Sequence, residues 1–120
     1  MLRLAGIVAA IVCLISAAAI HVSADGAAPA AKLDYRLYCA RCHGFEGRGD
    51  GPAARTLTIK PRNFTDCGAM AKIPNGVLKK VIQDGGPAAG LSSEMPAWRE
   101  ILSDAKIDAL VKFIRGFCGK

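Results

Sequence analysis

The chain has 120 residues, a formal net charge of +6 and 52% hydrophobic residues. This length allows one small domain and excludes several. The basic excess does not indicate nucleic-acid binding, because the sequence has no recognised binding motif with interleaved aromatic residues.

Residues 1–24 are interpreted as a secretory signal. A positive start at Arg3 is followed by an apolar run from Leu4 to Ile20, and Val22-Ser23-Ala24 is a small-residue cleavage site. An uncleaved membrane anchor is the alternative, because the stretch from Leu4 to Val22 is close to the length that spans a bilayer. We therefore expect a periplasmic protein that is membrane-attached only if this segment is retained.

The next segment, residues 25–31, is rich in Gly, Ala and Pro and is expected to be a flexible tether. The domain proper is then residues 32–120. From Lys32 to Cys39, the positions of Leu33, Leu37 and Tyr38 fit a two-turn helix.

This helix leads into a Cys-x-x-Cys-His run formed by Cys39, Cys42 and His43. The run is typical of covalent attachment of c-type haem, in which two thiols reach the two vinyl groups of one porphyrin. The imidazole of His43 would then bind the haem iron as the proximal ligand. Two alternatives stay open at this point, because zinc binding and thiol exchange use the same residue types.

The segment after the motif, residues 44–52, has four glycines and a proline and is expected to be a loop. Residues 53–57 fit a brief helical turn, and residues 60–67 are irregular, with Phe64 as a candidate core residue. A second helix is expected after Pro74 and should end at Gly85.

The clearest helix is the last one. Ser103 or Asp104 can cap it. An apolar stripe follows at helical spacing, formed by Ile107, Leu110, Val111 and Ile114 and widened by Phe113 and Phe117. No convincing strand pattern appears, so we expect an all-α domain of three to four helices with long loops wrapped around one haem.

The second iron ligand cannot be another histidine, because His43 is the only histidine once the signal is removed. The sixth position of the iron then goes to another residue or stays open, and the methionines that could fill it are Met70 and Met95. Met95 lies in a loop between two expected helices, and the fixed backbone of Pro96 can aim its side chain inward. Met70 is expected to fill core space, the commoner role of methionine.

The remaining cysteines, Cys67 and Cys118, form an even pair in an exported chain and can be bridged, although two separate thiols are the alternative. The charge excess is also localised, because residues 48–80 carry seven basic side chains against two acidic ones. This region is either an ordinary solvated surface or a docking face for an acidic partner.

The mature chain resembles the class I cytochromes c of the small bacterial periplasmic type, over most of residues 32–116. The resemblance is carried by the motif at residues 39–44, the loop with Gly51 and Pro52, residues 60–66, the Met-Pro-Ala-Trp segment at 95–98 and the final helix. It implies that His43 and Met95 are the axial ligands and that Cys39 and Cys42 anchor the haem.

The resemblance further implies that Pro52 offers its carbonyl to the ring N–H of His43, a bond that fixes which nitrogen faces the iron. It also implies that the first and last helices cross, joining Leu33 and Leu37 to Leu110, Ile114 and Phe117. The cysteine pair is outside the family pattern and gains no support from it.

The function indicated is one-electron transfer between redox proteins, with no catalytic residues. The alternatives are a haem domain permanently docked in a respiratory or dehydrogenase complex, and a haem-based ligand sensor. The donor and acceptor are not indicated by the sequence.

Overall fold

The computed structural model describes residues 26–119, so the predicted secretory segment lies outside the described residues. The α-helices are α1 (Ala27–Tyr38), α2 (Ala40–His43), α3 (Cys67–Ala71), α4 (Asn75–Asp84) and α5 (Asp104–Arg115), and the 3₁₀ helices are η3 (Pro52–Arg55), η4 (Gly86–Ala89) and η5 (Gly116–Gly119). Residues 26–119 contain no strand, which confirms the all-α prediction with one α-helix more than the upper number expected. No helix in this range is long and apolar enough to cross a membrane.

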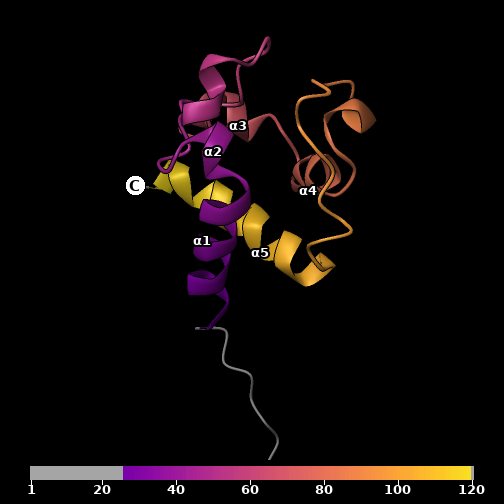
Figure 1. Ribbon diagram of the computed structural model, residues 1–120. Coiled ribbons are helices and arrows are strands. Elements are labelled where there is room, and N and C mark those ends of the chain that lie inside the picture. Colours follow the sequence, from indigo (N-terminus) through magenta and orange to yellow (C-terminus); the bar gives the residue numbers. More distant parts are fainter. Residues whose placement is uncertain (1–25, 120) are drawn as a thin grey trace, which may run out of the picture.

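Helix α1 begins at Ala27, inside the segment predicted to be a tether, and crosses α5 (Figure 1). It buries Ala31 and Tyr35, which are one helical turn apart and face α5 together. The crossing of the first and last helices is therefore as expected, but the residues that make it differ from the prediction.

The expectation for Leu33 and Leu37 is wrong, because their side chains are 58% and 62% exposed. At 3.6 residues per turn both positions lie on the side of α1 opposite Ala31 and Tyr35. The buried face also includes Asp34, whose carboxylate lies 3.2 Å from the Lys106 ammonium on α5.

Helix α5 supplies the centre of the core. Its predicted apolar stripe is buried, and the Ser103 hydroxyl accepts a bond from the Lys106 N–H as the N-cap. Tyr35 lies 5.2 Å from the Phe113 ring and 5.3 Å from the Phe117 ring, measured between ring centroids. These aromatic contacts pack the C-terminal half of α1 against the last turn of α5 and the following η5.

Helix α4 packs against α5 through Leu78 and Ile82, and ends at Gly85, as the sequence predicted. Gly85 has a φ of +81°, a backbone conformation that favours glycine. On the surface, Lys79 pairs with Asp108 at 2.8 Å. Figure 1 shows α4 on one side of the domain and α1, α2 and α3 on the other, with α5 running beneath both sides.

Helices α2 and α3 are the α-helices that the sequence did not indicate, and α3 is the one distant from the motif. Its N-cap is Asp66, whose carboxylate accepts a bond of 3.0 Å from the Ala69 N–H. Arg115 fastens the far end of α3 to α5, because its guanidinium donates to the carbonyls of Met70 and Ile73. Met70 is 1% exposed, which confirms its predicted place in the core.

A disulfide joins Cys67, at the start of α3, to Cys118 in η5, with Cα atoms 5.4 Å apart. The alternative of two separate thiols is therefore not what the structure shows. The bridge connects η5 to the first residue of α3.

Candidate cofactor-binding site

Cys39, Cys42 and His43 lie together where α1 passes into α2. Cys39 closes α1 through a bond of 2.9 Å from its N–H to the Tyr35 carbonyl, and His43 donates its own N–H to the Cys39 carbonyl at 2.9 Å. This single turn holds all three side chains at one place. Both thiols are free and half-buried.

The thiol of Cys39 is poorly suited to disulfide exchange. Burial, with a smaller contribution from the Asp34 charge, raises its pKa to about 12, so the reactive thiolate is scarce at neutral pH. Residues 26–119 contain no cluster of three His, Cys, Asp or Glu side chains suited to a metal ion. Covalent attachment to a porphyrin uses the two neighbouring thiols and the histidine without further ligands.

The imidazole of His43 is fixed through Nδ1, which lies 3.1 Å from the carbonyl oxygen of Arg62. The structure therefore corrects the expectation for Pro52, which instead begins the 3₁₀ helix η3. Backbone from the irregular 60–64 segment, and not from the glycine-rich loop, passes alongside the ring. A proton held on Nδ1 leaves the Nε2 lone pair for a metal ion.

Two features keep the His43 ring neutral and oriented. Burial lowers its pKa, against the opposing effect of the bond to Arg62, and a neutral imidazole is the form that binds metals. The Phe64 ring stacks on the imidazole at 4.4 Å between centroids, and Phe64 also stacks with Phe117 at 6.3 Å. The ring is therefore held by packing as well as by a hydrogen bond.

The turn after His43 depends on Tyr35 and on two glycines. The buried Tyr35 hydroxyl donates to the Gly44 carbonyl at 2.8 Å. Gly44 has a φ of +80°, and a Cβ there would collide with the Asp50 carboxylate. Gly51 lies against the carbonyls of Ala40 and Arg41, where a Cβ would also collide. These close approaches fold the glycine-rich loop back onto α2.

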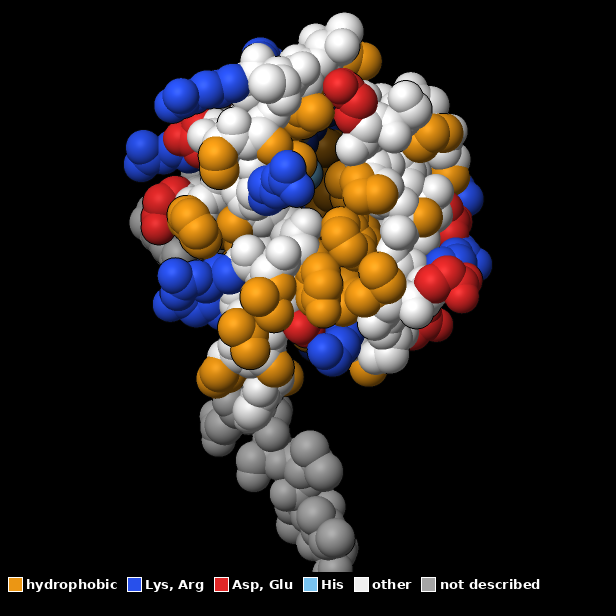
Figure 2. Space-filling model, in the orientation of Figure 1, with side chains coloured by type: hydrophobic (Ala, Val, Ile, Leu, Met, Phe, Trp, Pro, Cys, Tyr) orange, Lys and Arg blue, Asp and Glu red, His pale blue; other side chains and the backbone are white. Residues whose placement is uncertain are grey.

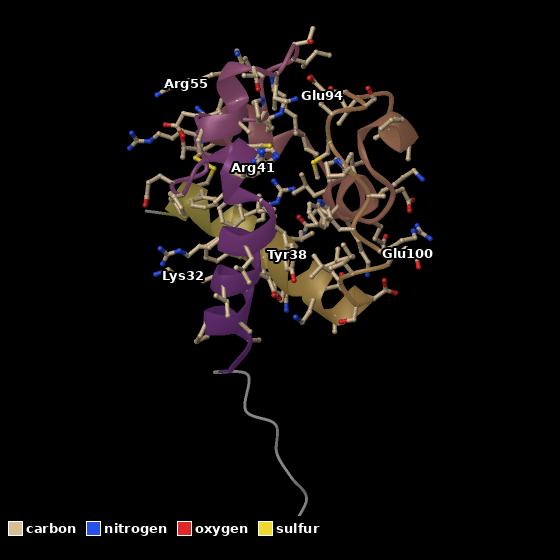
Figure 3. The ribbon with its side chains drawn as sticks, in the orientation of Figure 1. Lys32, Tyr38, Arg41, Arg55, Glu94 and Glu100 are labelled. Atoms are coloured by element: carbon tan, nitrogen blue, oxygen red, sulfur yellow. A yellow bond between two sulfur atoms is a disulfide. The ribbon has the colours of Figure 1, made fainter. Side chains whose placement is uncertain are left out.

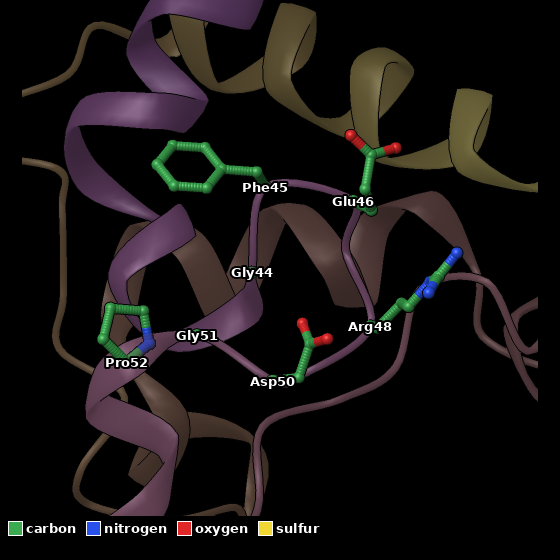
Figure 4. A pocket seen from close by; sticks show the side chains of 7 residues that line it. All are labelled: Gly44, Phe45, Glu46, Arg48, Asp50, Gly51 and Pro52. Carbon is green, nitrogen blue, oxygen red and sulfur yellow. The ribbon is translucent and has the colours of Figure 1, made fainter.

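That loop encloses a small hollow of about 260 Å³, lined by Gly44, Phe45, Glu46, Arg48, Asp50, Gly51 and Pro52. Figure 4 shows its polar side chains and the backbone turn around it. Neither motif cysteine nor His43 lines this hollow, so it is not the site at which the three predicted residues could act together.

A second hollow, in the upper half of the face in Figure 2, is bordered mainly by hydrophobic side chains. Half-buried Tyr38 and Trp98, with ring centroids 5.3 Å apart, link α1 to the segment before α5. An imidazole nitrogen, two thiols and apolar surroundings suit a flat, apolar, iron-bearing macrocycle.

Met95 is half-buried in the segment between η4 and α5. Its carbonyl accepts a bond of 2.9 Å from the Gly86 N–H, and its own N–H donates to the Ser92 carbonyl at 3.2 Å. The following Trp98 N–H donates to the Ile82 carbonyl at 2.9 Å. These hydrogen bonds attach the Met95 segment to η4 and α4. His43 lies in α2, on the side of the domain that contains α1.

Residues 26–114 match a family model described as cytochrome c oxidase, cbb3-type, subunit III. No curated protein sequence matches the chain significantly.

Among solved structures, the KustC0563 c-type cytochrome is similar, with a TM-score of 0.61 and 28% identity over 72% of this chain and 95% of that one. The Kuenenia stuttgartiensis reducing HAO-like protein complex Kustc0457/Kustc0458 also contains a similar chain. Its TM-score is 0.60 and its identity 29%, over 73% of this chain and 41% of that one.

Proposed function

The chain belongs to the family of cytochrome c oxidase, cbb3-type, subunit III, a family of cytochrome c electron carriers, and from that premise we propose that it is a periplasmic carrier of single electrons. It would use one covalently bound haem c. The observation that supports this most strongly is the placement of two free thiols and an imidazole with an available Nε2 in one turn.

Each residue has a defined part in this proposal. The thiols of Cys39 and Cys42 would anchor the macrocycle, and His43 Nε2 and the Met95 thioether would bind its iron. The Arg62 carbonyl and the Phe64 ring would hold the imidazole in one orientation. When bound, the haem supplies a metal that changes oxidation state by one electron, and thioether ligation raises its reduction potential.

Exposed basic side chains are available for docking to an acidic redox partner. Of the seven in residues 48–80, Lys79 and Lys80 pair with acidic residues. The exposed Arg48, Arg55, Arg62 and Lys72 have no ion pair among the described residues. Arg41 is also exposed, and it belongs to α2 together with His43. Such unpaired charges favour brief, salt-sensitive encounters with an acidic protein.

Replacement of Met95 tests the axial ligand. Met95→Ala should still fold and retain the haem, but it should lose the weak band at the red end of the oxidised spectrum that reports sulfur–iron bonding. The matched variant, Met70→Ala, should keep that band and lower the free energy of unfolding by about 2–5 kcal/mol, because Met70 is a core residue. Loss of the band in Met70→Ala alone would refute the assignment.

A second candidate function is a haem domain that stays docked in a larger redox assembly. It is favoured by the similarity to a chain of the reducing HAO-like protein complex. Size-exclusion chromatography of cell extracts distinguishes the two functions. A freely diffusing carrier should elute as a small protein, whereas a docked subunit should elute with its partners and stay with them at high salt.

A further inference from the structure

Glu94, the residue before the proposed ligand Met95, joins two loops that are distant in sequence. Its carboxylate lies 3.3 Å from the backbone nitrogen of Thr58 and 3.4 Å from that of Ile59. The same carboxylate accepts from the Ser92 hydroxyl at 3.3 Å. Two consecutive backbone N–H groups directed at one carboxylate form a small anion-binding arrangement.

These contacts link the segment after η3 to the segment after η4. Among the hydrogen bonds described for residues 26–119, only those of Glu94 connect residues 56–60 with residues 90–97. Figure 3 shows Glu94 at the top of the view, between the side of the domain with α1–α3 and the side with α4, and away from α5. The carboxylate thus connects the two sides at the end that α5 does not bridge.

The Met95 segment is fixed on its other side by a backbone bond of 2.9 Å from the Gly86 N–H to the Met95 carbonyl. A further bond of 3.1 Å, from the Glu94 N–H to the Ser92 hydroxyl, lies within the segment. With the Glu94 carboxylate removed, residues 92–95 would stay attached to the α4 side alone. No other hydrogen bond described for residues 26–119 joins residues 92–95 to Thr58 or Ile59.

We propose that Glu94 is a positioning residue that latches the Met95 segment to the Thr58–Ile59 backbone and thereby limits replacement of the Met95 thioether by small ligands. This inference rests on the proposed function, in which Met95 binds the iron. The contribution of the two bonds to holding the Met95 segment is modest, because distances of 3.3 and 3.4 Å are longer than usual for N–H···O bonds and Glu94 is exposed to water. The negative charge of the acceptor strengthens both bonds.

The test is an imidazole titration of the oxidised holoprotein, followed through loss of the weak sulfur–iron band. Glu94→Ala should bind imidazole about fivefold more tightly than the unmodified protein, the factor expected from loss of charge-assisted bonds at a partly solvated site. Glu94→Gln should be intermediate, because its amide oxygen can accept one of the two bonds. Glu100→Ala is the matched control, since Glu100 is exposed and has no hydrogen bond or ion pair among the described residues.

A second measurement does not depend on the iron. Hydrogen exchange at the Thr58 and Ile59 amides should be faster in Glu94→Ala and unchanged in Glu100→Ala. Unchanged imidazole affinity and unchanged amide exchange in Glu94→Ala would overturn the latch, as would an equal effect in Glu100→Ala. If Glu94→Ala does not mature, Glu94→Gln decides by the same two readouts. Failure of the proposed function is separate, because it would appear as an unmodified red band in Met95→Ala.

Discussion

Removal of the Cys67–Cys118 crosslink should have a large effect on the free energy of unfolding. The bridge closes a loop with a sequence separation of 51. The loss of chain entropy in the unfolded state corresponds to about 4 kcal/mol for a loop of this length. The Cα separation of 5.4 Å lies within the range usual for disulfides.

Cys67→Ser is the cleanest perturbation, because Cys67 is exposed and serine loses little packing there. The free energy of unfolding of the oxidised holoprotein, measured by guanidinium titration, should fall by about 4 kcal/mol. For a domain of this size that corresponds to a decrease in Tm of roughly 20 °C. Serine variants are preferable to a chemical reductant, which would also change the oxidation state of the iron.

The double variant Cys67→Ser/Cys118→Ser is the control for a reactive lone thiol. It should match the single variant within about 1 kcal/mol, since the crosslink is already absent in both. A loss below about 1 kcal/mol in both variants would refute the reasoning, because chain entropy requires several times that value.

Two further substitutions test contacts around the motif. Tyr35→Phe should lower the free energy of unfolding by about 1–2 kcal/mol, because it leaves the Gly44 carbonyl without its buried donor, and an unchanged thermal unfolding curve would contradict this. Arg115→Lys should cost about 1–3 kcal/mol, since an ammonium cannot replace the planar fork that reaches the carbonyls of Met70 and Ile73, and a lysine variant as stable as arginine would show that charge alone suffices.

The parts of the fold that the sequence predicted are those governed by local patterns. The α5 stripe, the Ser103 cap and the stop at Gly85 each depend on residues a few positions apart, and each is found in the structure. The Cys-x-x-Cys-His motif is local in the same sense. Its three side chains lie in one turn because their spacing places them there.

The errors concern contacts between distant segments. Leu33 and Leu37 were the predicted core residues of α1. The helix instead buries the smaller Ala31, and Asp34, which forms an ion pair. The partner that makes Asp34 acceptable inside is Lys106, 72 positions away, which no local pattern reveals.

The same reason explains what sequence reasoning missed at the site. The group at His43 Nδ1 is a backbone carbonyl, that of Arg62, and a carbonyl carries no residue-type signal. Its position depends on the path of the irregular 60–64 segment. Glu94 was missed likewise, because its backbone partners lie 35 and 36 positions earlier.

Intact mass under denaturing conditions tests the central claim most directly. Protein produced in cells with a complete haem-attachment apparatus should weigh the mature polypeptide plus one haem, and should show the reduced-minus-oxidised spectrum of a low-spin c-type haem. A colourless product with the mass of the polypeptide alone, from those same cells, would contradict the assignment of Cys39, Cys42 and His43.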